Sequence, residues 1–293
     1  MEYGQRDSNI TDGIQAVVYT AAIHPDNPEF LAARNKNIPM LTRAELLGEI
    51  MRNYKQAVNV SGTHGKTTTT SMLTEILLAA HMDPTVTVGG LLPSIKGNIR
   101  VGGSKLFVTE ACEYTNSFLS FFPTMEIILN IEADHLDFFK DLDDIRRSFR
   151  LFAEKLDEKG TLIISSDIQN MEEITNNLPC QVITFGRDPK NSRYSAEGIT
   201  YDKYGRPSYT LLEDGKAVGD ITLGVLGEYN VYNSLASIAA ARELGVSIKQ
   251  IQEGLCHFTG AGRRFEKKGE IGGVTIIDDY AHHPQEIAAT LAT

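Results

Sequence analysis

Residues 57–80 read AVNVSGTHGKTTTTSMLTEILLAA, and this stretch decides the fold. A short β-branched run comes first, then a glycine-rich turn, and then apolar residues spaced as on one face of a helix. Because such a turn brings backbone N–H groups and a helix N-terminus to one point, it favours a bound phosphate group. Lys66 adds a positive charge for the outer phosphates, and the Thr67 hydroxyl is placed to ligate Mg²⁺. The stretch therefore predicts a nucleotide-binding loop.

The turn departs from the complete phosphate-loop rule at Val60, where the rule has a glycine. A glycine-rich turn that only starts a helix is the alternative interpretation. The preceding strand, the Lys-Thr pair and the following helix together favour nucleotide binding. A phosphate-loop kinase or GTPase would also need a metal-holding Asp after a strand and a guanine-reading motif, and the sequence carries neither clearly.

Composition narrows the class of protein. Of the 293 residues, 42% are hydrophobic and 23% are charged, as is ordinary for a globular protein, and the formal net charge is −10. An acidic chain argues against non-specific binding of nucleic acid, although a local basic pocket for a phosphorylated small molecule remains allowed. The three cysteines are too few and too scattered for a disulfide framework or a cysteine zinc site. No run is long enough to span a bilayer and the first residues do not read as a secretory signal, so we expect a cytoplasmic protein without membrane insertion.

Alternating strand and helix patterns predict an α/β fold with a mostly parallel sheet, flanking helices and the phosphate-binding loop. Residues 57–262 are predicted to form a central ATP-binding domain, because the alternation is sustained there. Residues 1–56 and 263–293 each hold too few strands and helices to bury a core. We therefore expect these two ends to be partial N- and C-terminal α/β domains.

The same patterns predict individual elements. Apolar runs predict strands at 16–20, 57–60, 106–109, 126–131, 161–164, 181–184 and 274–277. Alternation around Asp214-Gly215 predicts a hairpin over 209–223. Helical spacing predicts helices at 29–35, 43–54, 66–80, 142–156, 230–244, 248–257 and 285–291. Thr42 and Ser247 stand where the N-caps of two of these helices belong.

Polar residues follow two of the predicted strands. Glu110 ends one strand and His135 follows the next. Because ligands gather at the carboxyl ends of parallel strands, both side chains are expected beside Thr67, where the three form a candidate Mg²⁺ site. A solvated surface carboxylate and a locally hydrogen-bonded histidine are the alternatives. Asp134 and Asp137, on either side of the histidine, are interpreted as helix caps.

Gly62 to Thr68 resembles the ATP loop of the Mur ligases, the ATP-dependent amide-forming enzymes of peptidoglycan precursor synthesis. Residues 130–137, NIEADHLD, are similar to a segment of that family whose histidine approaches a second magnesium ion and the substrate carboxylate. The resemblance implies that ATP and Mg²⁺ are the cofactors. It also implies ATP contacts from Gly62, Thr63, His64, Gly65, Lys66, Thr67 and Thr68, and catalytic roles for Lys66, Glu110 and His135.

Later segments extend the resemblance. Residues 227–233 resemble a Gly-x-x-Asn-x-x-Asn motif, which implies that Asn230 recognises adenine, with helix capping as the alternative. Residues 260–265 resemble a hinge into the last domain, which implies that Arg264 reaches an ATP phosphate as a catalytic group, with a structural ion pair as the alternative. Asp279 resembles a residue that contacts the ribose. The implied substrate contacts are Glu113, Tyr280, His282 and His283.

Residues 110–119 and 278–284 resemble the branch of the family that joins L-alanine to UDP-N-acetylmuramate. This implies that the muramoyl carboxylate attacks the γ-phosphorus of ATP and forms an acyl phosphate, which the amine of L-alanine then attacks. It also implies that residues 1–56 belong to a UDP-sugar-binding domain and that residues 263–293 begin a truncated ligase domain. The branch that attaches a tripeptide to the same sugar nucleotide is one alternative. A nucleotide-binding fragment that does not catalyse is another.

Overall fold

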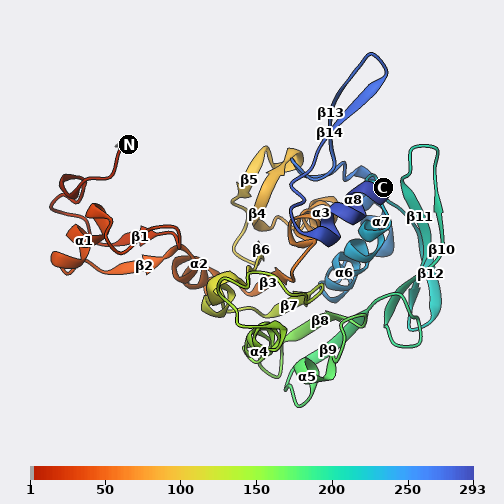
Figure 1. Cartoon of the computed structure of the whole chain (residues 1–293). Coiled ribbons are helices and arrows are strands. Elements are labelled where there is room, and N and C mark those ends of the chain that lie inside the picture. Colours follow the sequence, from red (N-terminus) through yellow and green to blue (C-terminus); the bar gives the residue numbers. More distant parts are fainter. Residues whose placement is uncertain (1–2) are drawn as a thin grey trace.

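The computed structural model describes residues 3–293 and confirms the predicted α/β fold, with a mainly parallel sheet flanked by helices (Figure 1). The central sheet has ten strands in the order β12 (Lys216–Thr222), β11 (Pro207–Glu213), β10 (Tyr194–Tyr201), β9 (Gln181–Phe185), β8 (Thr161–Ser165), β7 (Met125–Ile128), β3 (Gln56–Ser61), β6 (Leu106–Glu110), β4 (Thr85–Leu92) and β5 (Gly97–Arg100). The strands from β9 to β4 pair in parallel, whereas β5 and the β10-β11-β12 meander add antiparallel pairs at the two edges. The parallel centre places the carboxyl ends of β3, β6 and β7 at one edge of the sheet.

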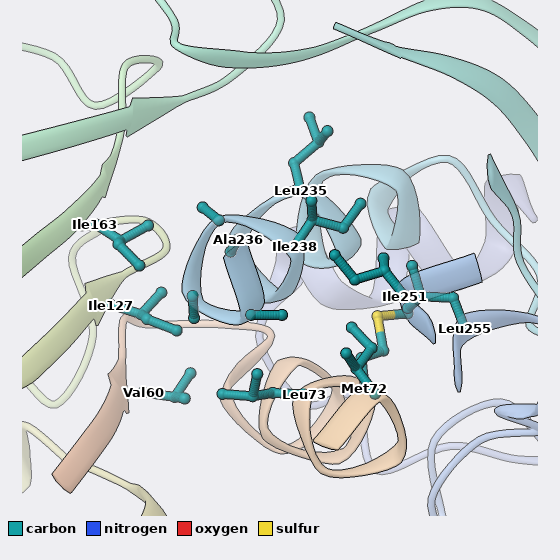
Figure 2. Close-up of a cluster of buried hydrophobic side chains, with 14 of the residues drawn as sticks. Val60, Met72, Leu73, Ile127, Ile163, Leu235, Ala236, Ile238, Ile251 and Leu255 are labelled. Carbon is teal, nitrogen blue, oxygen red and sulfur yellow. The ribbon is translucent and has the colours of Figure 1, made fainter. Parts of the chain in front are cut away.

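Helices α3 (Lys66–Ala79), α6 (Tyr229–Glu243) and α7 (Ile248–His257) cover one face of the sheet. Figure 2 shows their apolar side chains in one cluster with those of the strands, with Val60 beside Leu73 and Ile127 beside Ile163. All four side chains are fully buried, and each such burial contributes about 1.5–3 kcal/mol. Because parallel strands are covered on both faces, the run from Ala57 to Ser61 is buried throughout.

The other face is covered by α4 (Leu142–Ala153), with α2 (Arg43–Met51) and the 3-10 turn η3 (Tyr114–Ser120) beside it. Phe118 stacks on Phe152 with ring centroids 4.4 Å apart and meets Phe149 edge-on at 5.4 Å. The short helix α5 (Glu172–Thr175) packs against α4. The aromatic cluster holds the loop after β6 in place, and this loop carries part of the site described below.

Two smaller units flank the sheet (Figure 1). At the N-terminal side, β1 (Val17–Tyr19) and β2 (Met40–Thr42) pair in parallel, next to η1 (Asp7–Asn9) and α1 (Pro28–Asn35). At the C-terminal side, β13 (Glu266–Ile271) and β14 (Val274–Asp278) form a hairpin that projects from the body, and α8 (Pro284–Ala292) follows. Within the described residues, no helix combines the length and apolar character that a bilayer crossing needs.

Several local predictions are confirmed. Thr42 forms a capping box with Glu45, and Ser247 forms another with Gln250. The hairpin β11–β12 turns at Asp214-Gly215, where both residues have positive φ angles, of 51° and 71°. Two positive φ angles are what a two-residue hairpin turn with the twist of the flanking strands requires.

Other predictions are wrong in detail. Strand β7 ends at Ile128 rather than at 131, and α2 and α4 end three residues earlier than predicted. Residues 136–138 form a turn and no helix begins beside Asp134 or Asp137, so the interpretation of these two residues as helix caps is wrong. The strands β2, β4, β5, β10 and β13 were not predicted, nor were α5 and the 3-10 turns η1, η2 (Pro93–Ile95) and η3. Gly89 and Gly90 interrupt the apolar pattern of β4, so its sequence gives only a weak strand signal. Hydrogen bonding to β6 stabilises the strand instead.

Candidate functional site

The predicted phosphate loop connects the end of β3 to the start of α3. Gly62 and Gly65 have φ angles of 133° and 85°, which side-chain-bearing residues rarely adopt. A Cβ atom on Gly65 would lie 2.5 Å from Oδ1 of Asn233, and one on Gly62 would lie 2.9 Å from Cβ of Leu129. Both glycines are therefore required by backbone conformation and by close packing.

The loop is fastened to the segment that follows β7. The backbone N–H of His64 donates to Oδ1 of Asn130 at 2.8 Å, and Nδ2 of the same asparagine donates to the carbonyl of His64 at 3.1 Å. Oγ1 of Thr63 accepts from the N–H of Glu132 at 2.9 Å. These bonds fix the loop before any ligand binds, which is the preorganisation that a phosphate site needs.

Lys66 lies at the first position of α3, with its ammonium group inside the loop. Its Nζ donates to the carbonyls of Gly62 at 2.5 Å and Thr63 at 3.1 Å, and lies 3.1 Å from Oε2 of Glu113. The side chains of Lys66 and Glu113 are only 16% and 3% exposed. The structure thus brings the predicted catalytic lysine and one predicted substrate contact into a largely buried ion pair.

Thr67 and Glu110 also come together, as predicted. Oγ1 of Thr67 donates to Oε2 of Glu110 at 3.1 Å, and the backbone N–H of Gly89 donates to Oε1 at 2.5 Å. Burial raises the pKa of Glu110, while the hydrogen bonds from Gly89 and Thr67 and the charges of Lys66 and Arg264 act in the opposite direction. A hydroxyl and a carboxylate side by side are hard oxygen donors, so this pair fits Mg²⁺.

His135 lies further along the same edge of the sheet. Its ring packs on that of Tyr114 with centroids 4.5 Å apart, and its Nε2 is 3.9 Å from Oδ2 of Asp134. Asp137 accepts a hydrogen bond from the Tyr114 hydroxyl at 2.8 Å. Thr67 is hydrogen-bonded directly to Glu110. Among the described residues, the side-chain contacts of His135 are with Tyr114 and Asp134 and not with Thr67 or Glu110.

Strained backbone accompanies these contacts. His135 has a φ angle of 52°, and Thr115 and Asn116, next to Tyr114, have φ angles of 55° and 57°. Non-glycine residues in the left-handed region cost free energy and cluster at functional sites. The loops after β6 and β7 thus carry their strain beside the candidate site.

A cavity of about 910 Å³ opens beside the phosphate loop. Its walls come from the loop itself, the ends of β8 and β9, the start of α6, and the C-terminal segment with Arg264, Asp279 and α8. Arg187, just after β9, lies over the ring of Tyr232 at 4.8 Å and pairs with Asp167 at 3.7 Å on the cavity wall. This volume suits a nucleotide.

Sequence analysis missed the three cavity residues Asp167, Arg187 and Tyr232. The strand-end rule that found Glu110 applies equally to Asp167 and Arg187, which follow two further parallel strands. Tyr232 carries no such signal, because only the packing of α6 decides that it faces the cavity.

The two asparagines of α6 differ in their surroundings. Asn230 donates through Nδ2 to the carbonyl of Leu226 at 2.7 Å, and its Oδ1 accepts from Nδ2 of Asn233 at 3.0 Å. Asn233, not Asn230, lines the cavity and touches Gly65. The predicted adenine contact Asn230 is thus positioned behind Asn233.

The C-terminal segment approaches the loop as well. Both carboxylate oxygens of Asp279 accept backbone N–H groups, those of Phe265 and Ala281, each at 2.7 Å. The Arg264 guanidinium lies 5.5 Å from the Tyr280 ring centroid. Its positive charge acts to lower the pKa of Glu110, against the effect of burial. Of the two predicted histidines, His282 packs on Tyr280 at 5.4 Å, whereas the His283 ring lies 4.6 Å from that of His64.

Comparisons with known proteins agree with this arrangement. The model of the Mur ligase middle domain matches residues 60–241, more than half of the chain. The models described as Mur ligase family, catalytic domain, and as Mur ligase, glutamate ligase domain, match residues 2–55 and 263–293.

Individual relatives point in the same direction. The chain is 65% identical to the UDP-N-acetylmuramate–L-alanine ligase of Lachnospira eligens over 99% of its length, and spans 63% of that relative. The crystal structure of UDP-N-acetylmuramate-alanine ligase MurC from Thermotoga maritima is 31% identical, with a TM-score of 0.85, and the match covers 99% of this chain and 66% of that one. For UDP-N-acetylmuramate:L-alanyl-gamma-D-glutamyl-meso-diaminopimelate ligase from Neisseria meningitides the identity is 27% and the TM-score 0.79, with 89% and 84% covered. The chain thus spans less than two thirds of the length of its L-alanine-ligase relatives, and it belongs to the Mur ligase family.

Proposed function

We propose that this chain carries the nucleotide-binding centre of an ATP-dependent ligase that joins L-alanine to the carboxylate of UDP-N-acetylmuramate in peptidoglycan precursor synthesis. The observation that carries the proposal is the convergence of Lys66, Thr67 and Glu110 at the carboxyl ends of β3 and β6. The 65% identity to an L-alanine-adding relative supports the choice of substrates. Because the reaction consumes ATP, we expect it in the cytoplasm.

The reaction proceeds through an activated carboxylate. A muramoyl carboxylate oxygen attacks the γ-phosphorus of ATP, the bond to the β-phosphate oxygen breaks, and ADP leaves. The amine of L-alanine attacks the acyl carbon, the C–O bond to phosphate breaks, and the amine loses a proton as the amide forms. No covalent bond to the protein is needed, so the residues act by binding, orientation and electrostatics.

Each proposed residue has a place in this scheme. The loop from Gly62 to Thr68 binds the phosphates, and Lys66 with Arg264 offsets the charge on the transferring phosphoryl group. Mg²⁺ held by Thr67, Glu110 and His135 would add positive charge at the phosphates. Of the predicted base and ribose contacts, Asn230 would act on the adenine through Asn233, which donates to Asn230 and lines the cavity. Asp279, which also lines the cavity, would contact the ribose.

We propose three parts for the chain, 1–56, 57–262 and 263–293. The first would contribute to holding the UDP sugar, the second holds ATP, and the third brings Tyr280, His282 and His283 to the meeting point of acceptor and muramoyl group. Family models matching residues 2–55, 60–241 and 263–293 support this division. Bringing these parts together would keep water from the acyl phosphate.

One experiment separates the proposal from its alternatives. Phosphate release is measured with the chain, ATP, Mg²⁺ and UDP-N-acetylmuramate, and either L-alanine or the tripeptide L-alanyl-γ-D-glutamyl-meso-diaminopimelate is added. We expect release with L-alanine and little with the tripeptide. The reverse preference would favour the tripeptide ligase and overturn our choice of acceptor. No release with either acceptor, combined with an increase in Tm on adding ATP, would favour a nucleotide-binding fragment that does not catalyse.

A further inference from the structure

A second group of ligand-type side chains lies next to the phosphate loop, apart from the Thr67–Glu110 pair. His64, Glu132 and His283 each offer one ligand atom, and these three atoms all lie within 4.8 Å of one another. Nε2 of His64 is 3.2 Å from Oε2 of Glu132, and the rings of His64 and His283 are 4.6 Å apart. All three side chains are partly buried and come from three separate segments of the chain.

We propose that His64, Glu132 and His283 form a binding site for a divalent transition-metal ion of the Zn²⁺ or Co²⁺ class. Bonds of about 2.0–2.1 Å place the ligand atoms of a tetrahedral zinc site about 3.3–3.4 Å apart. The 3.2 Å separation between His64 and Glu132 already matches one such edge. A small approach of the His283 ring completes a three-residue face.

The donor set decides which ion binds. Two imidazoles and one carboxylate are a known ligand set for zinc, and imidazole also suits Co²⁺, Ni²⁺ and Cu²⁺. Mg²⁺ prefers oxygen ligands and keeps several waters, so it is expected at the hydroxyl and carboxylate of Thr67 and Glu110. The two sites therefore differ in chemistry as well as in residues.

Two of the three ligands are held in place before a metal binds. His64 is tied through its backbone N–H and carbonyl to the side chain of Asn130, at 2.8 and 3.1 Å. Glu132 is tied through its N–H to Oγ1 of Thr63 at 2.9 Å. These bonds fix the backbone at both residues, which lowers the entropy cost of bringing the ligands together. Asp279 in turn anchors the segment that leads to His283, by accepting the N–H of Ala281.

Two consequences follow from the position of the site. A bound ion would join the segment after β14 to the phosphate loop, because His283 is the ligand that the C-terminal segment supplies. Three protein ligands leave a fourth position for a water or another oxygen, and both His64 and Glu132 line the 910 Å³ cavity. The site thus ties the C-terminal segment to the nucleotide cavity.

The test measures metal binding directly and does not depend on ligase activity. The chain, freed of metals, is titrated with Zn²⁺ against a chromophoric chelator and with Co²⁺ by visible absorption, in excess Mg²⁺. We expect one saturable equivalent, with the intense absorption of tetrahedral Co²⁺. His283→Ala and Glu132→Gln should each weaken binding by at least about tenfold. His282→Ala is the matched control, because this neighbouring ring packs on Tyr280 and is not one of the three grouped ligands, and it should bind Zn²⁺ like the unaltered chain.

Thermal unfolding shows whether a variant that loses Zn²⁺ binding is still folded. Zn²⁺ should raise the Tm of the unaltered chain and of His282→Ala, but not that of a folded His283→Ala. Glu110→Gln should retain the Zn²⁺ response, so a failure of the proposed ligase activity would leave this result unchanged. Absence of saturable binding by the unaltered chain, or equal binding by His283→Ala, would overturn the proposal.

Discussion

The phosphate loop and the C-terminal hairpin β13–β14 use similar local sequences in opposite surroundings. Each combines β-branched strand residues with glycines at positive φ, and Gly65 and Gly273 have nearly the same angle, 85° and 80°. Val60 before the loop is fully buried, whereas Val274 in the hairpin is 65% exposed. A Cβ on Gly65 would meet Asn233 at 2.5 Å, whereas nothing lies within 4 Å of one on Gly273. Local sequence determines the backbone conformation in both places. A binding site forms only at the phosphate loop, because neighbouring elements pack against it.

The largest expected effect separates the lysines of the two regions. Lys66→Ala removes the ammonium that offsets charge on the transferring phosphoryl group, so phosphate release should fall at least about 1000-fold, or about 4 kcal/mol in the activation barrier. Lys267→Ala in the hairpin is the control and should leave the rate unchanged. Circular dichroism checks that both variants are folded. Near-normal turnover by folded Lys66→Ala would remove the loop from the mechanism.

The second prediction substitutes the two glycines. Gly65→Ala combines left-handed strain with a clash against Asn233 and Leu129, and should destabilise the chain by about 2–4 kcal/mol. Gly273→Ala meets the same strain without the clash, and should cost about 1–2 kcal/mol. Urea unfolding of both variants measures the difference. Equal losses would mean that the packing around the loop does not constrain it.

The parts of the site predicted from sequence are those with local signals. The loop is a continuous motif, and Glu110 follows from the rule that parallel strands deliver their ends to one edge. The resemblance to the Mur ligases is confirmed by the family models, and it rested on the same contiguous segments.

The remaining features depend on tertiary packing. Asn230 and Asn233 are three residues apart in one helix, and only the rotation of α6 against the loop decides that Asn233 faces the cavity. Strand β4 is stabilised by its pairing with β6, although Gly89-Gly90 weakens its own pattern. The cap interpretation of Asp134 and Asp137 was wrong because the chain forms a turn there instead of a helix, and Asp137 and His135 contact Tyr114, which is distant in sequence.

The third prediction compares two carboxylates. Glu126 in β7 is fully buried, and within the described part of the chain neither of its oxygens has a hydrogen-bond partner. Burial raises the pKa of Glu126 well above its usual value, and the charge of Lys155 only partly opposes this. The native state therefore keeps a proton that the unfolded chain releases, so stability falls as pH rises from the unfolded pKa, about 4.3, towards the raised native pKa.

Glu126→Gln removes this dependence. Relative to the unaltered chain, the variant should gain stability as pH rises through this window, by up to about 1.4 kcal/mol per pH unit. Glu270→Gln in the hairpin, where the carboxylate is 54% exposed, is the matched control and should follow the unaltered chain. Urea midpoints at several pH values test both. Parallel curves for Glu126→Gln and the unaltered chain would contradict a raised pKa.

The smallest effect is expected in the hairpin itself. Lys267 pairs with Glu270 at 3.2 Å, but the two side chains are 58% and 54% exposed. Solvent screens such a pair and ordering two long side chains costs entropy, so Lys267→Ala should lower the free energy of unfolding by less than about 0.5 kcal/mol. Urea unfolding at low and high salt measures this, and the small loss should shrink further as salt rises. A loss above about 1 kcal/mol would show that the hairpin is coupled to the folded body, and would weaken its contrast with the phosphate loop.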